Sequence, residues 1–255
     1  MANIGISSAR GFRFTLAFSL TAFALLACGK AGTGKSGAYQ APVEPFPFLG
    51  KSATFAILAQ QSINNIGATV IYGDVGLSQG SVMTGFATVR STGGSLHPAD
   101  ALALRAQADS QNAYNNIRQK TCDHQLTGQD LGGMTLKPGT YCFDGDANLN
   151  GLLTLDFQGN KNANFLFQLG NNLRTGTDAG MRIIGDGESC NVFWLVSGTA
   201  RLSALTNFSG AIFSFGDINM GVNAKLNGKL MSRTGSVNLN SNEIYNNTCP
   251  WPGAN

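Results

Sequence analysis

Charged residues are scarce in this chain of 255 residues. Asp, Glu, Lys and Arg make up 12% of it, about half of their usual share in a soluble domain. The formal net charge of +3 falls to +1 when residues 1–27 are set aside, because 15 basic side chains then face 14 acidic ones. No basic stripe remains, which excludes the electrostatic footprint of a nucleic-acid-binding protein.

Histidine and metal-binding motifs are also scarce. The chain has two histidines, His97 and His124, and no CxxC pair, so a zinc site lacks its ligands. Neither histidine has a serine or cysteine nucleophile at a suggestive spacing. The segment that starts at Asp144 begins like a calcium loop, but leucine stands where glycine and glutamate are required. We therefore expect no enzyme activity, no metal and no cofactor.

The apolar run at residues 14–27 is too short to cross a membrane, which takes about 20 residues. It follows two arginines and is typical of a secretory signal peptide over residues 1–27. The run ends in Leu25-Leu26-Ala27-Cys28, which resembles the lipobox of bacterial lipoproteins. That resemblance implies acylation of Cys28, and Gly29 after it implies the outer membrane. Because Leu26 is less usual there than a smaller residue, ordinary secretion is the alternative.

Residues 28–50 are rich in glycine and proline and are predicted to form a flexible tether between the lipid anchor and a folded domain at residues 51–255. Residues 29–36, GKAGTGKS, match the P-loop pattern GxxxxGK[ST] letter for letter. A working P-loop lies between a buried strand and a helix, whereas this segment follows a signal sequence and precedes prolines. We therefore expect no nucleotide binding.

Asparagine and glycine are abundant. The chain has 33 glycines and 24 asparagines, 21 of the latter from Asn112 onward. Both residue types favour turns and tolerate left-handed backbone, which argues against a helical bundle. Short apolar stretches at residues 54–89, and again after residue 126, alternate with these turn residues. They are predicted to be strands.

One long helix is predicted at residues 98–119. This segment has no glycine, and Pro98 suits the first helical position. Small residues recur at helical spacing, with a single isoleucine at the end, at positions 99, 103, 106, 110, 113 and 117. Such a stripe can lie close against a sheet.

The C-terminal half of the chain repeats itself. Apolar strands begin at residues 165, 192, 211 and 229, spaced 27, 19 and 18 residues apart, which is about one turn of a solenoid. Shorter segments at residues 173, 201, 218 and 237 alternate apolar with small polar residues and can face water. A mainly β, parallel β-solenoid is predicted, with the helix covering its apolar side. A β-sandwich is the alternative, and the few hairpin signals disfavour it.

Setting Cys28 aside leaves four cysteines, an even number in an exported chain. Two disulfide bonds are therefore expected. Four cysteines allow three pairings. Proximity favours Cys122 with Cys142, which leaves Cys190 with Cys249 to hold the C-terminal tail.

Several segments resemble the DUF3494-type ice-binding proteins of cold-adapted microbes. Besides the helical segment, they are ATFAILAQQSINNIGATVIYGDVGLS, LTGQDLGGMTLKPGTYCF, LNGLLTLDFQG, NFLFQLG, CNVFWLVSGTARL and AKLNGKLMSRTGSVNLNSNEI. The resemblance runs from about Ser52 to Cys249, and the combination of GxDLGGxTLxPGxYCF with NVFW is specific. The chain is identified as a member of this family.

The resemblance implies a right-handed, discontinuous β-solenoid of triangular section, with the helix along one side and an ice-binding surface on another. It also implies ice as the partner of a monomer, and four cysteines in corresponding places are common in the family. Parallel coils stack about 4.8 Å apart, and outward side chains recur about every 6.6 Å along a strand. Short, stiff side chains on such a grid can order water, whereas long charged ones are mobile.

Outward positions on the alternating segments are the candidate site. Family members often show Thr-Ala/Gly-x-Thr/Asn there, and residues 234–238 approximate this with one insertion. The predicted ice-binding residues are Ser62, Asn64, Asn172, Thr199, Ser203, Asn219, Thr234, Ser236, Asn238 and Asn240.

Two arginines, Arg174 and Arg201, are predicted to project from the same plane and to interrupt it. We therefore expect modest activity, with inhibition of ice recrystallisation stronger than depression of the freezing point. The alternative function is a surface adhesin or glycan-binding module on the same scaffold, in which these arginines engage acidic sugars.

Overall fold

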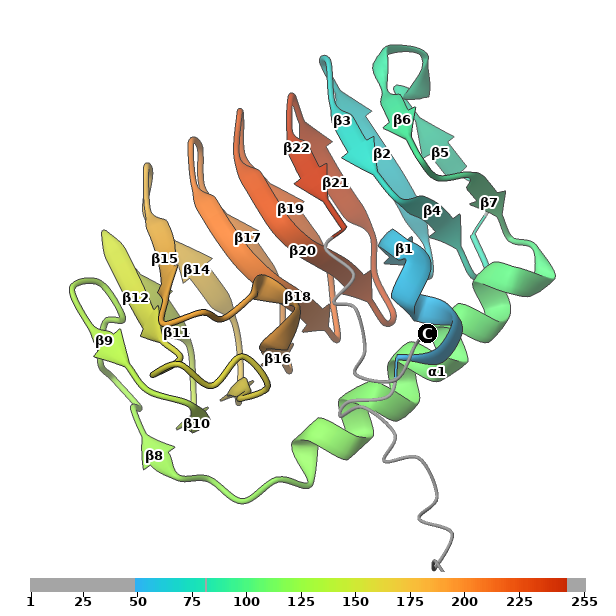
Figure 1. The fold of residues 1–255 in the computed structure, drawn as a ribbon. Helices are drawn as coiled ribbons and strands as arrows, with labels where there is room; N and C mark the ends of the chain where they lie inside the picture. The colour runs from blue at the N-terminus through green and yellow to red at the C-terminus, as the bar shows by residue number, and fades with distance from the viewer. Residues whose placement is uncertain (1–48, 81, 247–255) are drawn as a thin grey trace, which may run out of the picture. The chain divides into compact units, whose positions relative to one another are not determined.

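The computed structural model describes residues 49–80 and 82–246 (Figure 1). The predicted signal peptide, Cys28, the P-loop-like segment and Cys249 lie outside the described residues. Within the described ranges, no helix is both long enough and apolar enough to cross a membrane.

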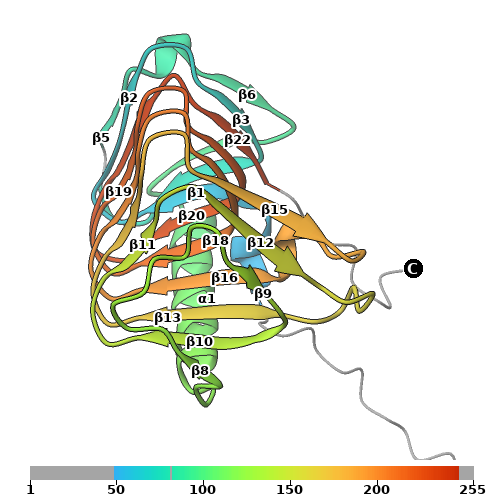
Figure 2. The same cartoon turned by 90° about the vertical axis from the view of Figure 1, so that its left-hand side faces the viewer.

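The described chain winds into parallel coils, and the strands of each coil lie on three sides that enclose a roughly triangular core (Figure 2). We call these the covered side, the ladder side and the third side. Among the described residues, three short 3-10 helices occur at Gly50–Thr54 (η1), Phe86–Thr88 (η2) and Ser189–Asn191 (η3). The predicted parallel β-solenoid is confirmed.

The strands divide among the three sides as follows. The covered side holds β1 (Phe55–Ala59), β4 (Asp74–Leu77), β7 (Leu96–Pro98), β8 (His124–Gln125), β10 (Gly139–Phe143), β13 (Phe165–Leu169), β16 (Val192–Val196) and the second halves of β18 (Asn207–Ser214) and β20 (Lys225–Ser232). The ladder side holds β2 (Ser62–Ile66), β5 (Val82–Thr84), β11 (Ala147–Leu149), β14 (Leu173–Thr175), β17 (Ala200–Leu202), β19 (Ile218–Met220) and β21 (Val237–Asn240). The third side holds β3 (Val70–Tyr72), β6 (Arg90–Thr92), β9 (Thr135–Leu136), β12 (Leu152–Asp156), β15 (Gly180–Ile184), β22 (Glu243–Tyr245) and the first halves of β18 and β20.

The coils are not stacked in chain order. The N-terminal strands β1–β7 form one end of the stack, the helix carries the chain to the other end, and the later coils return (Figure 1). Strand β1 therefore pairs with β20, with Ile57 opposite Leu230, and β2 pairs with β21. This docking covers the edge that the last C-terminal coil would otherwise expose to other chains.

Inside the coils, residues in the same register stack on one another. Tyr141, Phe167 and Trp194 follow one another on neighbouring strands of the covered side. The rings of Phe167 and Trp194 are parallel, with centroids 3.8 Å apart, and the Trp194 indole N–H donates to the Ser209 carbonyl at 3.1 Å. Aromatic stacking adds to the burial energy, so this row of rings stabilises the coils that carry β10, β13 and β16.

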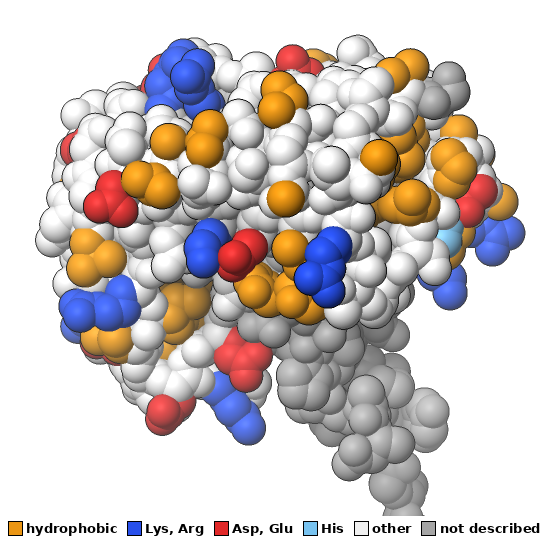
Figure 3. All heavy atoms as spheres, turned by 90° about the horizontal axis from the view of Figure 1, so that it is seen from above, with side chains coloured by type: hydrophobic (Ala, Val, Ile, Leu, Met, Phe, Trp, Pro, Cys, Tyr) orange, Lys and Arg blue, Asp and Glu red, His pale blue; other side chains and the backbone are white. Residues whose placement is uncertain are grey.

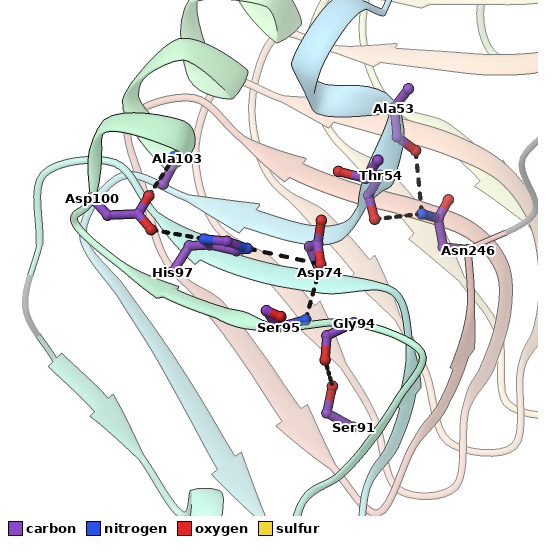
Figure 4. Close-up of polar contacts among 10 residues, drawn as sticks. All are labelled: Ala53, Thr54, Asp74, Ser91, Gly94, Ser95, His97, Asp100, Ala103 and Asn246. Atoms are coloured by element: carbon purple, nitrogen blue, oxygen red, sulfur yellow. Dashed lines mark hydrogen bonds and ion pairs between the residues drawn. The ribbon is translucent and has the colours of Figure 1, made fainter.

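The helix α1 (Ala101–Arg118) packs on the covered side, as predicted, through Ala103, Ala106, Ala113, Tyr114 and Ile117. Small residues let it lie close to the sheet, where Phe193 and Phe213 are buried beneath it. The predicted start was wrong. Pro98 ends strand β7, and Asp100 caps the helix by accepting the Ala103 N–H at 2.8 Å (Figure 4). The first backbone N–H groups of a helix have no carbonyl partner within it, and a side-chain oxygen supplies one.

Strands β18 and β20 are longer than the predicted apolar segments at residues 211 and 229. Each has eight residues and bends from the third side onto the covered side. The bend lies at Gly210, with a φ of 109°, which stands opposite Gly228. A Cβ at residue 228 would lie 1.9 Å from the Gly210 carbonyl oxygen, so glycine is required there.

The predicted disulfide bond between Cys122 and Cys142 is confirmed, with their Cα atoms 6.0 Å apart. It joins the segment after α1 to β10 at the end of the stack. Cys190 lies in η3. The proposed partner of Cys190 lies outside the described residues, so that pair stays a prediction.

Left-handed residues stack at the corner between the ladder side and the third side. Asp178, Leu205, Asn223 and Ser241 have φ values of 60°, 62°, 58° and 53°, and each lies two residues before the next strand. Their backbone N–H groups donate to the neighbouring coil, as from Leu205 to the Val222 carbonyl at 2.9 Å. Asn223 suits this corner, because Asn adopts the left-handed conformation at a lower cost than leucine does.

Replacing Leu205 by Asn is expected to stabilise the protein. The leucine is 53% exposed and loses little burial, while relief of its left-handed strain is worth about 1 kcal/mol. Thermal unfolding followed by circular dichroism should give a melting temperature about 2–4 °C higher. The matched control, Asn223→Leu, should lower it by a similar amount. A lower melting temperature for Leu205→Asn would contradict the strain at this corner.

Candidate functional site

Seven outward residues, one from each strand of the ladder side, share a single register. We call them the central row. In spatial order they are Asn148, Arg174, Arg201, Asn219, Asn238, Asn64 and Thr84. Their neighbours along each strand point inward, as Ile63 and Val237 do, which is the alternation that the sequence predicts.

Four members of the central row are joined by side-chain hydrogen bonds. The Thr84 hydroxyl donates to Asn64 Oδ1 at 3.0 Å. Asn64 Nδ2 donates to Asn238 Oδ1 at 2.9 Å, and Asn238 Nδ2 donates to Asn219 Oδ1 at 2.8 Å. We call these four residues the amide row. Because the two central asparagines each accept on one side and donate on the other, the orientation of their amides is set by the stack of coils.

A second row runs beside the amide row, two residues earlier on each coil. The Ser62 hydroxyl donates to Ser236 Oγ at 2.8 Å, and Asn64 Nδ2 donates to Ser62 Oγ at 3.1 Å. The Ser236 backbone N–H donates to Asp217 Oδ1 at 2.8 Å. These contacts cross-link the two rows, so neither is free to change rotamer independently.

The flanking residues nearer the arginines are held in the same way. Asn172 Oδ1 accepts from the backbone N–H and the hydroxyl of Thr199, at 2.9 and 3.0 Å. Ser203 lies on the opposite flank, where its hydroxyl donates to the Thr175 carbonyl at 2.6 Å. Each contact joins neighbouring coils, and each fixes a short polar group at the surface.

The structure brings nine of the ten predicted site residues together. Five lie within the strands of the ladder side: Ser62, Asn64, Asn219, Asn238 and Asn240. Four lie one residue beyond a strand of that side: Asn172, Thr199, Ser203 and Ser236. Thr234 instead lies in the turn before β21, where its hydroxyl donates to the Phe215 carbonyl at 2.5 Å.

Two members of the central row, Thr84 and Asn148, were missed from the sequence. Both obey the same alternation, since Met83 packs against the core and Ala147 is buried. Their strands have only three residues each. A period-two pattern in so short a segment is a weak signal on its own, and register with neighbouring coils is what identifies them.

The two arginines stand side by side in the central row, as Arg174 is opposite Arg201. Arg174 Nε donates to Asp146 Oδ2 at 3.1 Å. The backbone N–H of Asn172 and the Arg174 guanidinium lower the pKa of the Asp146 carboxyl. Arg201 is exposed. The central row is therefore divided. We call the part of the ladder side around the amide row the uncharged half, because its central residues carry no charge, although the Asp217 carboxylate lies at its flank. The part around the two arginines is the arginine half.

Isolated exposed apolar side chains lie at the edge of the uncharged half. Val82 is opposite Ser62, two residues before Thr84, and is 51% exposed, and Ile66 at the end of β2 is 68% exposed. Figure 3 looks down on the ridge where the ladder side and the third side meet. Uncharged surface predominates there, with scattered apolar side chains, and two basic groups with an acidic group between them lie close to its middle.

The histidines have structural contacts in the described chain. His97 Nδ1 lies 2.7 Å from Asp100 Oδ2, beside the helix cap, and its Nε2 lies 3.8 Å from Asp74 Oδ1 (Figure 4). The His124 ring stacks on Tyr141 with centroids 4.9 Å apart. Among residues 49–80 and 82–246, no group of three or more His, Cys, Asp or Glu is arranged to hold a metal ion.

Comparison with known proteins agrees with this geometry. A family model described as "Ice-binding-like" matches residues 57–245. An ice-binding protein of Nostoc sp. (strain HG1) is 35% identical over 209 residues, which cover 81% of this chain and 77% of that protein. An ice-binding protein of Flavobacterium frigoris (strain PS1) is 30% identical over 212 residues, which cover 77% of this chain and 75% of that protein.

Two solved structures share the fold. The ice-binding protein from the Antarctic ascomycete Antarctomyces psychrotrophicus has 33% identity and a TM-score of 0.76, covering 79% of this chain and 98% of that one. An ice-binding protein from an Antarctic biological consortium has 32% identity and the same TM-score of 0.76, covering 81% of this chain and 93% of that one. The family match spans most of the described residues, and the protein belongs to the ice-binding-like family.

Proposed function

We propose that this protein adsorbs to ice through the ladder side, with the amide row as the main contact, and that it does so without chemical turnover. The observation that carries this proposal is the chain of hydrogen bonds from Thr84 through Asn64 and Asn238 to Asn219. It holds small uncharged groups at fixed positions on a stack of parallel strands.

The amide row can order water because part of its hydrogen-bonding capacity is left over. An amide NH2 has two donors, and its oxygen accepts two hydrogen bonds. Asn238 uses one donor on Asn219 and one acceptor position for Asn64, so one donor and one acceptor position are left for water. With coils about 4.8 Å apart, these positions repeat regularly, and water bound to them loses little further entropy on freezing.

The arginine half supports a modest activity. Long charged side chains lose rotamer entropy when they are immobilised, and their hydration shells do not match a flat ice surface. We therefore propose inhibition of ice recrystallisation as the main effect, ahead of depression of the freezing point. The competing glycan-binding function has one feature in its favour, the adjacent Arg174 and Arg201, but Asp146 already neutralises the first of them.

We also propose that the protein is held at the cell surface by acyl chains on Cys28. The sequence Leu25-Leu26-Ala27-Cys28 supports this, and the Gly- and Pro-rich residues 28–50 give the folded domain reach from the membrane. A tethered ice-binding surface would hold the cell to ice. Ordinary secretion is the alternative.

Replacing Asn238 by Tyr is expected to lower the activity severalfold without unfolding the protein. The tyrosine would stand above the amide row and break two of its three hydrogen bonds. The purified domain should be compared in a recrystallisation assay, with circular dichroism as the check on folding. Thr92→Tyr, which adds the same side chain on the exposed third side, should keep full activity. Unchanged activity in Asn238→Tyr would mean that another side binds ice.

Replacing Arg201 by Thr is expected to raise the activity or leave it unchanged, because the substitution extends the uncharged half by one short side chain. Arg182→Thr is the matched control, since Arg182 is exposed on the third side. Recrystallisation inhibition and crystal shape should be measured for both variants. A large loss confined to Arg201→Thr, together with retention of the native protein on a glycan array, would favour the glycan-binding alternative.

Replacing Cys28 by Ser is expected to release the protein from the membrane fraction, because acylation requires the thiol. Fractionation of cells expressing the native chain and the variant, followed by immunoblotting, measures this directly. The ice-binding activity of the released protein should be unchanged. If the variant and the native chain fractionate identically, the acyl anchor is ruled out.

A further inference from the structure

A buried lysine lies where the N-terminal coils dock on the C-terminal ones. Lys229, on β20, points out of the coil on the covered side, beneath η1 and the start of β1. It is 4% exposed, whereas the remaining buried residues of its strand carry no charge. A lysine in such a place is unusual, and neither the ladder side nor the proposed ice contact uses it.

The lysine amine is in direct contact with a side-chain amide. Lys229 Nζ donates to Asn246 Oδ1 and to the Ala53 carbonyl, and it lies 3.4 Å from the Phe55 carbonyl oxygen. The amide is itself held in place, since Asn246 Nδ2 donates to the Thr54 carbonyl at 2.7 Å and to that of Ala53 at 3.2 Å (Figure 4). Nucleophile and carbonyl carbon are therefore oriented by the fold.

The charge of one carboxylate, Asp74, acts on this amine. Burial lowers the pKa of the Lys229 amine to about 7, and the nearby charge of Asp74 opposes that shift. At neutral pH a large fraction of the amine is therefore uncharged and nucleophilic. The Asp74 side chain is 18% exposed. Its neighbour Gly73 lies against Asn246, since a Cβ there would be 2.9 Å from that of Asn246.

We propose that Lys229 and Asn246 are a self-modification site, at which the two side chains join in an intramolecular isopeptide bond with Asp74 as the proton-transfer group. The neutral Lys229 Nζ attacks Asn246 Cγ. A new bond forms between Nζ and Cγ, and the bond between Cγ and Nδ2 breaks. One proton passes from Nζ through the Asp74 carboxylate to the departing nitrogen, which leaves as ammonia. The product is a secondary amide, and no oxidant, metal or cofactor is consumed.

Three features separate this arrangement from a lysine that is merely hydrogen-bonded. The acceptor is a side-chain amide whose nitrogen can leave, a substantial share of the amine is neutral at pH 7, and the charge of Asp74 acts on the amine. Lys229 and Asn246 are 17 residues apart in sequence. The bond would clamp the segment after β22 onto β20, beside the backbone of Ala53 and Thr54. It would thus reinforce the junction on which the ladder side depends.

Peptide mapping of the purified full chain tests the proposal. After unfolding, reduction and alkylation, trypsin should cut after Lys225 and Arg233 but not after Lys229, because an acylated lysine is not cleaved. The expected product is a branched peptide in which residues 226–233 are joined through Lys229 to Asn246 of residues 234–255, lighter by one ammonia than the two peptides together. Efficient cleavage after Lys229 and an unlinked peptide 234–255 would overturn the proposal and leave a buried, hydrogen-bonded lysine only.

Two variants complete the test. Lys229→Arg keeps the charge and cannot form the bond, so its peptide 234–255 should be unlinked and carry the full mass of Asn246.

Asp74→Asn tests the role of the carboxylate. It preserves an acceptor for the Ser95 N–H, whose nitrogen lies 2.9 Å from Asp74 Oδ1 in the native chain. The variant should fold normally by circular dichroism and lose most of the branched peptide. A branched peptide of undiminished yield in folded Asp74→Asn would refute the role of Asp74. Fragmentation that placed the lost ammonia elsewhere than at Lys229 and Asn246 would refute the bond.

Discussion

Hydrogen bonding between successive coils in a constant register is the constraint on which the rest of this structure depends. Because parallel strands pair residue for residue, every position of one coil lies next to its counterpart in the next. Inside, this stacks Tyr141, Phe167 and Trp194. At the corner it stacks left-handed residues, and on the ladder side it aligns the central row. One regularity therefore produces the core, the turns and the candidate site.

Because the stack of coils is discontinuous, segments that are far apart in the sequence must pack together at one junction. The N-terminal coils must dock on an edge that was completed far later in the chain, so the helix and η1 both lie across this junction. Among the polar groups found there, His97 links β7 with Asp74 of β4 and with Asp100 at the start of α1. Lys229 of β20 contacts Ala53 of η1 and Asn246. Such polar contacts are directional, which suits a junction that must set the register of β2 against β21.

The amide row and the arginine half show how the same backbone grid can carry two different surfaces. An asparagine bonded to its neighbours across strands is short and loses little freedom when water orders on it. An arginine at an equivalent position keeps a long mobile side chain and its own hydration. The strands of the two halves pair in the same way. The halves therefore differ in the length of their side chains and in how far those side chains are hydrogen-bonded to neighbouring coils. Water order should therefore be greatest over the amide row.

Much of this protein was determined by its sequence alone, because the signals are local. The period of about 18 residues predicts the coils, alternation predicts which side chains face outward, and the small-residue stripe predicts the covering helix. Resemblance to known ice-binding proteins supplied the discontinuous topology. The pairing of Cys122 with Cys142 also follows from proximity.

Other features were decided only by the tertiary structure, because they depend on contacts between distant segments. They are the helix cap at Asp100, the strand bends at Gly210 and Gly228, the place of Thr84 and Asn148 in the central row, and the contact of Lys229 with Asn246 near Asp74. Short strands and single residues carry too little periodicity to be placed in advance, so their neighbours are set by the register that forms when the coils stack.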